Sequence, residues 1–274
     1  MKPFIKWVGG KTQILDDTLS LFPTTIENYH EPFVGGGSVL LSVLSKNIVH
    51  DKIYACDTNY SLIQLYKHVQ NNFEELYNEL KKIFKNYENN FEEKEKEKYY
   101  YSMRQLFNTC DKNSIEHSAL FMFLNKTCFR GLYREGPNGF NVPYGHYKKV
   151  NIIEKDELEK ISELIKNVNF ECLDFRESLK KVGSHDFVYL DPPYAPETKN
   201  SFVGYTKDGF KLEDHNELFK TIKENLPKFV MSNSNVELVN EIFQGYNKKV
   251  IIAKRAINSK NPESKTEEII VYRT

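Results

Sequence analysis

The segment of this chain best suited to chemistry is an aspartate followed by two prolines and a tyrosine, residues 191–194. The apolar, β-branched and aromatic run before it, residues 187–190, is typical of a buried strand. Because proline cannot continue a central strand, we expect Asp191 at the carboxyl edge of a sheet. There the Asp191 carboxylate and the Pro192 carbonyl could each accept one N–H of an exocyclic amine, while Tyr194 stacks on the attached ring. The segment suits a planar nitrogen heterocycle, and a strand followed by a stiff turn is the alternative.

A second candidate site is a glycine-rich turn between a predicted strand and a predicted helix. Phe33 precedes this turn, and Gly35 and Gly37 lie within it, where glycine lets the backbone approach a ligand closely. Asp57 ends the next predicted strand, and its carboxylate could accept both hydroxyls of a ribose. The dinucleotide fingerprint would need glycine in place of Leu40, so the pattern disfavours an NAD site.

The amino-terminal segment contains a partial phosphate-loop pattern. Gly10-Lys11-Thr12 resembles the end of such a loop, but Ile5 stands where its first glycine belongs, which disfavours an ATPase. Trp7, the only tryptophan, could be ordinary core. Alternatively, the Trp7 indole forms an apolar wall and the Lys11 ammonium supplies a positive charge at one edge of a cofactor pocket.

The composition indicates a globular intracellular protein. The 274 residues suffice for one large domain or two modest ones, and 40% hydrophobic with 14% aromatic residues argue against disorder. The four cysteines are widely spaced, which disfavours zinc sites and disulfides, and we identify neither a signal peptide nor a membrane-spanning run. Because 38 basic residues balance 38 acidic ones, any basic surface that binds nucleic acid must be confined to one part of the protein.

Strand patterns that alternate with helical patterns predict an α/β sheet. The helical periodicity of residues 61–125 predicts an inserted lobe, and glycine, proline and asparagine in residues 129–149 predict a loop or hairpin. Helices are also expected near residue 14 and over residues 38–44. Strands are predicted at residues 5–7, 29–34, 52–56, 169–173, 187–190, 228–231, 249–253 and 268–272.

Several short motifs in one order resemble the Dam-type, or α-group, DNA adenine-N6 methyltransferases. The resemblance covers nearly the whole chain. Its motifs are Lys6-Trp7-Val8-Gly9-Gly10-Lys11, Glu31-Pro32-Phe33-Val34-Gly35-Gly36-Gly37, Asp57-Thr58-Asn59, Asn138-Gly139-Phe140-Asn141-Val142-Pro143-Tyr144-Gly145, Asp191-Pro192-Pro193-Tyr194 and Ser232-Asn233.

This resemblance implies a Rossmann-like S-adenosylmethionine-dependent methyltransferase sheet with an inserted, mainly helical target-recognition lobe. Residues 1–60 and 150–274 would form the catalytic domain, and residues 61–149 the DNA-binding domain. It implies Asp191, Pro192 and Tyr194 as catalytic residues and no metal. S-adenosyl-L-methionine would be bound by Trp7, Lys11, Phe33, Gly35, Gly37, Asp57 and Asp191.

The expected chemistry is direct methyl transfer to adenine N6, driven by positioning and electrostatics without a covalent enzyme intermediate. Since the amine is stacked inside a duplex, the adenine must be flipped out, and Tyr194 would then stack on it.

Reading of double-stranded DNA is expected from the basic segment 125–149. Arg134 stands where Dam-type enzymes carry a base-reading arginine, and a phosphate contact is the alternative. Arg130 departs from the Dam pattern, which has asparagine there, so GATC is favoured while CATG or a related site stays open. Further DNA contacts are assigned to Arg130, Asn141 and Lys148, and a cognate restriction endonuclease is a possible functional partner.

Other classes of protein remain open at this stage. RNA methyltransferases can carry the Asp-Pro-Pro-Tyr motif but lack the helical insertion, and protein glutamine methyltransferases have asparagine where Asp191 stands. A catalytically silent DNA-binding protein is the non-enzyme alternative.

Overall fold

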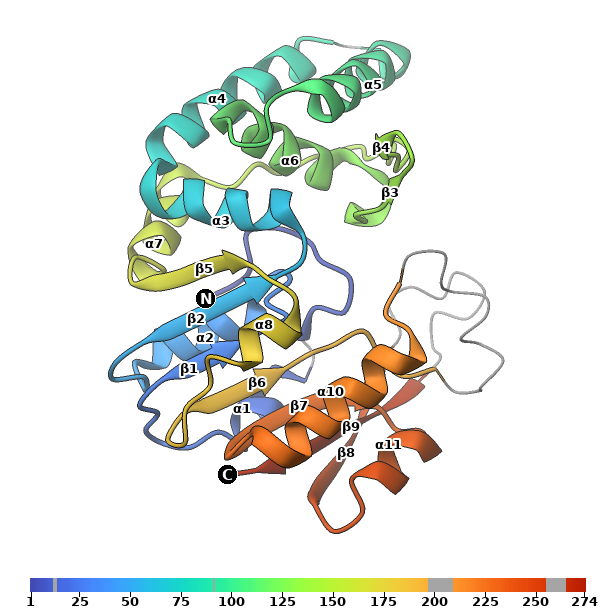
Figure 1. Ribbon diagram of the computed structural model, residues 1–274. Coiled ribbons are helices and arrows are strands. Elements are labelled where there is room, and N and C mark those ends of the chain that lie inside the picture. Colours follow the sequence, from blue (N-terminus) through green and yellow to red (C-terminus); the bar gives the residue numbers. More distant parts are fainter. Residues whose placement is uncertain (12–13, 91, 197–208, 255–264) are drawn as a thin grey trace. The chain divides into compact units, whose positions relative to one another are not determined.

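The computed structural model describes residues 1–274 except 12–13, 91, 197–208 and 255–264 (Figure 1). The chain divides into two compact units, each assembled from separate stretches of sequence. The first unit contains Met1–Gly10, Gly35–Ser45 and Asn59–Cys172, and the second contains Lys11–Val34, Lys46–Thr58 and Leu173–Thr274.

The second unit is built on a mixed sheet whose strands run in the order β2-β1-β6-β7-β9-β8. Strands β2, β1, β6 and β7 are parallel, whereas β9 is antiparallel to both β7 and β8. Because β9 runs against the four parallel strands, it begins at the edge of the sheet where those strands end. The first residues of β9 therefore lie beside the carboxyl end of β7, at the same edge as the carboxyl end of β6. The strands are β1 (Tyr29–Glu31), β2 (Ile53–Asp57), β6 (Phe187–Leu190), β7 (Lys228–Ser234), β8 (Asn247–Lys254) and β9 (Lys265–Arg273).

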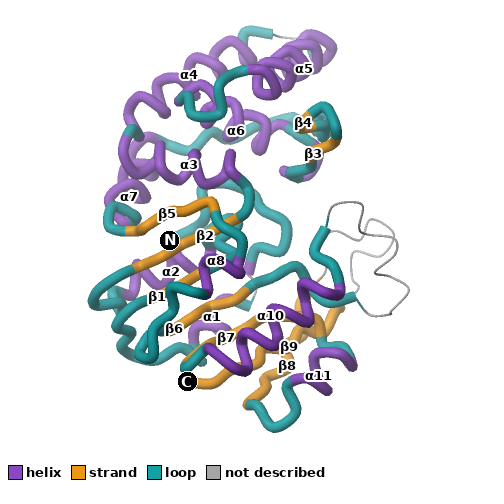
Figure 2. The backbone as a smooth tube through the Cα atoms, in the orientation of Figure 1, coloured by secondary structure: helices purple, strands orange, loops and turns teal. Residues whose placement is uncertain are grey.

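Helices lie against this sheet (Figure 2), and its apolar residues form a buried core. Strand β6 is buried along its whole length, as expected for a parallel strand covered on both faces. Helix α10 contributes Leu218, Phe219 and Ile222 to the core around β6 and β7. The helices of this unit are α1 (Leu15–Leu19), α8 (Phe175–Leu179), α10 (Leu212–Asn225) and α11 (Glu237–Ile242).

The first unit is mainly helical, and α6 is its centre. Helix α6 is buried from His117 to Asn125 and packs against α3, α4 and α5. Asn59 and Ser114 cap α3 and α6 by accepting hydrogen bonds from backbone N–H groups of their first turns. The elements are α2 (Ser38–Lys46), α3 (Tyr60–Asn71), α4 (Phe73–Glu88), α5 (Glu93–Thr109), α6 (Ile115–Thr127), a 3₁₀ turn (Phe129–Gly131), β3 (Glu135–Gly136), β4 (Gly139–Phe140), α7 (Lys155–Leu164) and β5 (Val168–Cys172).

The predicted strand at residues 5–7 is wrong. The Lys6 backbone N–H donates to Asn125 Oδ1 at 2.8 Å, and Asn125 Nδ2 donates to the Lys6 carbonyl at 2.8 Å. A side-chain amide thus satisfies both backbone groups that a neighbouring strand would otherwise bind. The predicted helices and the other predicted strands are present, although β1 ends at Glu31, before the predicted boundary.

Within the described residues, no helix is both long enough and apolar enough to cross a bilayer.

Candidate active site and DNA-reading hairpin

Asp191 forms a largely buried ion pair at the carboxyl end of β6. Its Oδ1 lies 2.8 Å from Lys11 Nζ, and the exposed fractions of the two side chains are 20% and 5%. Burial raises the pKa of Asp191 above its usual value, the nearby Lys11 ammonium opposes that rise, and the Glu268 carboxylate adds to it. Lys11 therefore stabilises the carboxylate form of Asp191 at the position predicted for catalysis.

Tyr194 completes this cluster in the second unit. Lys11 Nζ lies 4.5 Å from the centroid of the Tyr194 ring, a cation–π contact that occupies one face of the ring. The Tyr194 hydroxyl donates a 2.6 Å hydrogen bond to Glu268 Oε2. Burial and the surrounding carboxylates raise the pKa of Tyr194, so its hydroxyl stays protonated and acts as a donor.

Glu268 is a site residue that the sequence analysis missed. It belongs to no motif and lies far from Asp191 in sequence, yet it pairs with Ser234 at the end of β7. The available signal was topological: an antiparallel last strand would bring its first residues to the edge that carries Asp191.

The tip of β7 holds the segment that follows Asp191. Asn233 Oδ1 accepts hydrogen bonds from the backbone N–H groups of Ala195 and Ser234, both at 2.9 Å. Ser232 Oγ shares a 3.2 Å hydrogen bond with the Tyr189 hydroxyl. The Ser232-Asn233 motif therefore contacts the Tyr189 side chain before residues 191–194 and holds the Ala195 backbone after them.

In the first unit, the glycine turn packs directly against aromatic side chains. Gly35 and Gly37 have φ angles of 47° and 71°, in the left-handed region that favours glycine. A Cβ at Gly35 would lie 2.8 Å from Trp7 Cδ1, and one at Gly37 would lie 2.6 Å from the Tyr66 hydroxyl. The Tyr66 hydroxyl donates to the Gly35 carbonyl at 2.9 Å. Contacts within the protein thus require these glycines.

Trp7 is half-buried and stacks on other rings of the first unit. Its ring centroid lies 5.7 Å from that of Tyr133 and 6.3 Å from that of Phe121. These contacts fix the indole as a rigid aromatic wall, which is compatible with the predicted role beside a cofactor.

The remaining predicted cofactor residues lie in the second unit. Phe33 stacks on Phe175, with ring centroids 5.9 Å apart, and Asp57 is the last residue of β2. An aromatic ring can pack against the adenine of S-adenosylmethionine, a strand-end carboxylate can accept from its ribose hydroxyls, and the Lys11–Asp191 pair offers a donor and an acceptor for its amino-acid group.

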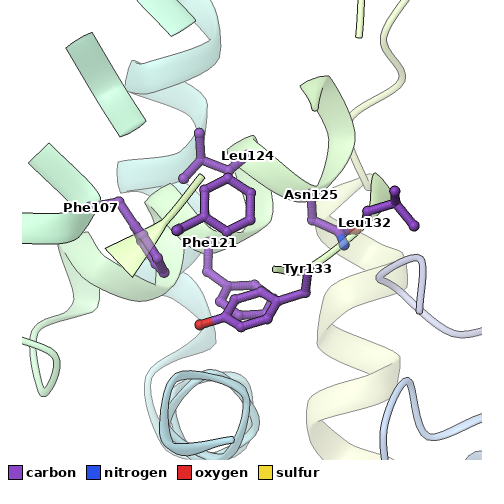
Figure 3. Close-up of a pocket in the computed structure, with 7 residues that line it drawn as sticks. Phe107, Phe121, Leu124, Asn125, Leu132 and Tyr133 are labelled. Carbon is purple, nitrogen blue, oxygen red and sulfur yellow. The ribbon is translucent and has the colours of Figure 1, made fainter. Parts of the chain in front are cut away.

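A small cavity beside the stacked rings belongs to the core of the first unit (Figure 3). Its volume is about 10 Å³, room for no more than one water molecule. Asn125, its one amide-bearing lining residue, already donates to the Lys6 and Gly131 carbonyls and accepts from the Lys6 N–H. The cavity is therefore a packing gap and not a ligand site. Phe107, Phe121, Leu124, Asn125, Leu132, Tyr133 and Phe140 line it.

The predicted DNA-reading residues Arg134 and Asn141 contact each other across the β3–β4 hairpin. Arg134 Nε donates a 2.6 Å hydrogen bond to Asn141 Oδ1, and the Asn141 N–H donates to the Arg134 carbonyl at 3.1 Å. A Cβ at Gly136 would lie 2.6 Å from Asn141 Nδ2, so glycine makes room for the amide. Arg134 and Asn141 are both exposed.

Helix α5 anchors this hairpin through side chains that bond its backbone. Asn108 Oδ1 accepts from the Phe140 N–H at 2.8 Å, and Asn108 Nδ2 donates to the Phe140 carbonyl at 3.0 Å. Tyr100 and Arg104 both donate to the Val142 carbonyl. The hairpin is thus rigidly placed on the helical unit.

The other predicted DNA-binding residues, Arg130 and Lys148, are exposed in the segments that flank the hairpin. Arg130 has a φ angle of 57°, and its guanidinium lies 5.2 Å from the centroid of the Phe129 ring. Left-handed backbone is unfavourable for arginine and better tolerated by asparagine, the residue of the Dam pattern at this position.

An α/β sheet that carries Asp-Pro-Pro-Tyr at its carboxyl edge, with a helical insertion, is the architecture expected of an amine-directed methyltransferase. Residues 7–257 match the family described as "D12 class N6 adenine-specific DNA methyltransferase", and the chain belongs to this family. It is therefore an adenine-specific DNA methyltransferase of the α/β, Rossmann-like class, with S-adenosylmethionine as methyl donor.

Named relatives are similar over nearly their whole lengths. The chain is 41% identical to the type II methyltransferase M.MjaIII of Methanocaldococcus jannaschii, over 97% of this chain and 96% of that protein. It is 34% identical to the type II methyltransferase M1.LlaDCHI of Lactococcus lactis, over 99% and 95%. It is 33% identical to a DNA adenine methylase of Haemophilus influenzae, over 98% and 92%.

Proposed function

We propose that this enzyme methylates N6 of an adenine flipped out of a short duplex site, with GATC favoured and CATG or a related site next. The Lys11–Asp191–Tyr194 cluster is the observation that carries the proposal. Residues 1–60 and 150–274 would perform catalysis, and residues 61–149 would recognise the target.

The cluster supplies the groups that an amine needs for attack. When bound, S-adenosylmethionine supplies an electrophilic methyl group on its sulfonium. With Lys11 on Oδ1, Asp191 offers its second oxygen to one N6 hydrogen, and the Pro192 carbonyl takes the other. Two such hydrogen bonds favour a pyramidal nitrogen whose lone pair is directed at the methyl group. Most of the rate gain then comes from orientation and fixed charges.

Tyr194 would receive the flipped adenine on one ring face, because the other face is covered by the Lys11 ammonium. Base–aromatic stacking contributes roughly 1–3 kcal/mol, which is comparable with the few kcal/mol required to unstack and unpair a base. The site therefore offsets much of the cost of flipping.

Arg134 would read a guanine of the site in the major groove. Asn141 accepts from Arg134 Nε through its Oδ1 at 2.6 Å and from Nη2 through its carbonyl at 3.4 Å. The other edge of the guanidinium, Nη1 with the second hydrogen of Nη2, would then act as a fork for guanine O6 and N7. Arg130 and Lys148 would contact phosphates nearby, and Asn141 would contribute by positioning Arg134.

A cognate restriction endonuclease is the proposed functional partner, without a requirement for physical association. The names of the relatives from Methanocaldococcus jannaschii and Lactococcus lactis, both type II methyltransferases, support this proposal.

Methylation of plasmid DNA inside cells tests the proposed site. Single-molecule sequencing of plasmid from cells that express the chain should show N6-methyladenine in one short motif, and mass spectrometry should identify the same nucleoside. Modification confined to RNA would favour the RNA methyltransferase alternative. Cofactor binding without modification of any nucleic acid would favour a silent DNA-binding protein.

A further inference from the structure

Glu268 lies where β9 enters the carboxyl edge of the sheet. It pairs in register with Ser234, the last residue of β7, while β6 ends next to β7 and delivers Asp191 to the same edge. The Glu268 side chain is 17% exposed. A carboxylate so little exposed to water needs hydrogen-bonding or charged partners. The partners of Glu268 are residues of the proposed active site.

Glu268 contacts Tyr194 and Lys11 directly and is linked to Asp191 through Lys11. Its Oε2 accepts the 2.6 Å hydrogen bond of the Tyr194 hydroxyl and lies 4.0 Å from Lys11 Nζ. Lys11 in turn lies 2.8 Å from Asp191 Oδ1. The ammonium is therefore held between two carboxylates and directly over the Tyr194 ring.

Building on the proposed function, we infer that Glu268 is a positioning residue of the methyl-transfer site. It fixes the orientation of the Tyr194 ring through the hydroxyl and keeps Lys11 on one face, so that a flipped base meets the other. The hydroxyl of Tyr194, and not the ring alone, is then part of the site.

Glu268 also acts on Asp191 through its charge. The groups that influence the pKa of Asp191 are the Lys11 ammonium, which lowers it, and the Glu268 carboxylate, which raises it. Tyr189 and Tyr194 also face Asp191, and Asp191 raises the pKa of both. Replacing Glu268 with a neutral residue should therefore shift the acid limb of the activity profile to lower pH.

A set of matched variants tests this inference. E268A removes the acceptor and the charge, whereas E268Q keeps an acceptor and removes only the charge. Y194F removes only the hydroxyl. E267A is the control, because Glu267 is the exposed neighbour on β9 and accepts from Asn235 Nδ2 at 2.8 Å.

We expect E268A and Y194F each to lower kcat by about tenfold, the effect of losing one hydrogen bond to a charged group. The double variant should be no slower than either single variant, because both changes break the same contact. E268Q should recover most of the rate lost in E268A and shift the acid limb of the pH–activity profile to lower pH. Fluorescence of 2-aminopurine at the target should show less flipping in E268A and Y194F than in E267A.

Effects of E268A equal to those of E267A, or effects of E268A and Y194F that multiply, would overturn the inference. So would an unshifted acid limb in E268Q. If E268A does not fold, the acid limb of E268Q and the kcat of Y194F still test the inference. Absence of N6-methyladenine with the unaltered enzyme would instead contradict the proposed function, so the two failures are distinct.

Discussion

At the scale of single residues, we expect Asp191 to determine how activity depends on pH. Burial raises its pKa above the usual value of about 4. In the proposed mechanism, the carboxylate is the form that would accept an N6 hydrogen. Activity should therefore be present above that raised pKa and be lost as the pH falls through it. Initial methylation rates across the acidic range, at saturating DNA, measure this limb.

Asp191→Asn should lower kcat on the order of a thousandfold, as expected when a group aimed at developing charge is neutralised. It should also weaken cofactor binding, measured by calorimetry. Asp51→Asn removes an exposed carboxylate of the same unit and serves as the control. An Asp191→Asn enzyme with an intact rate would contradict the assigned role.

The residues of the proposed catalytic cluster were predictable to the extent that they lie in local motifs. The Asp191–Tyr194 segment ends an apolar run, so its position at the sheet edge follows from sequence alone. The pairing of Asp191 with Lys11 was not predictable, because no local pattern specifies which charges meet across the sheet edge. Glu268 was missed for the same reason: its contacts depend on the antiparallel direction of β9.

At the scale of elements, the β3–β4 hairpin should determine which DNA sequence the enzyme recognises. Arg134→Ala should cost roughly 1–3 kcal/mol of discrimination at one base pair. Asn141→Ala should weaken the same discrimination by a smaller amount, because it releases Nε without removing the fork. Competition binding with single-base variants of the site measures both effects.

Lys148→Ala is the matched comparison, because a phosphate contact should weaken binding to all sequences alike and reduce the salt dependence. If Arg134→Ala shows that same uniform loss, Arg134 is a phosphate contact and does not read a base.

Arg130 introduces backbone strain into the turn that precedes the hairpin. Its φ angle of 57° is disfavoured for a residue with a long side chain. Arg130→Asn should therefore raise the free energy of unfolding by up to about 1 kcal/mol, since asparagine tolerates this conformation. Thermal unfolding measures the change. Lys148→Asn removes the same charge without relieving strain, so equal stability of the two variants would contradict this explanation.

The order of elements was largely predictable because each long element has a clear periodicity or a continuous apolar run. The predicted strand at residues 5–7 failed because local pattern cannot show that the amide of Asn125, far along the chain, binds the backbone of Lys6. The hairpin was predicted only as an ambiguous loop, because its register is fixed by Asn108 of α5.

At the scale of the whole molecule, a buried network in the second unit should make stability fall in acid. His30 is 1% exposed, and its Nε2–H donates to Asp186 Oδ2 at 2.8 Å. Asn28 Nδ2 and the Gly183 N–H also donate to the Asp186 carboxylate, both at 2.8 Å. The network connects β1 to the turn before β6, so it stabilises the centre of the sheet.

Both titratable groups of this network resist protonation in the folded state. Burial lowers the pKa of His30, although Asp186 opposes that shift, and His30 Nδ1 has no hydrogen-bond partner among the described residues. Burial would raise the pKa of Asp186, but hydrogen bonds from Gly183, Asn28 and His30 outweigh it and lower the value. The unfolded chain therefore binds more protons than the folded chain.

Stability should decline as the pH falls below about 6.5, where an unfolded histidine gains its proton, and decline further below about 4, where an unfolded aspartate does. Denaturant unfolding at a series of pH values measures this dependence. His30→Gln keeps a donor for Asp186 but cannot titrate, so it should make the upper part of the curve shallower. His117 and His215, whose pKa values burial lowers to about 4, should keep the rest of the slope. His50→Gln changes an exposed histidine of the same unit and should leave the curve unaltered. Asp186→Ala leaves three hydrogen-bond donors without their acceptor and should lower the free energy of unfolding by about 3 kcal/mol or more at neutral pH. Equal pH dependence in the His30→Gln and His50→Gln enzymes would show that this network is not what couples protonation to folding.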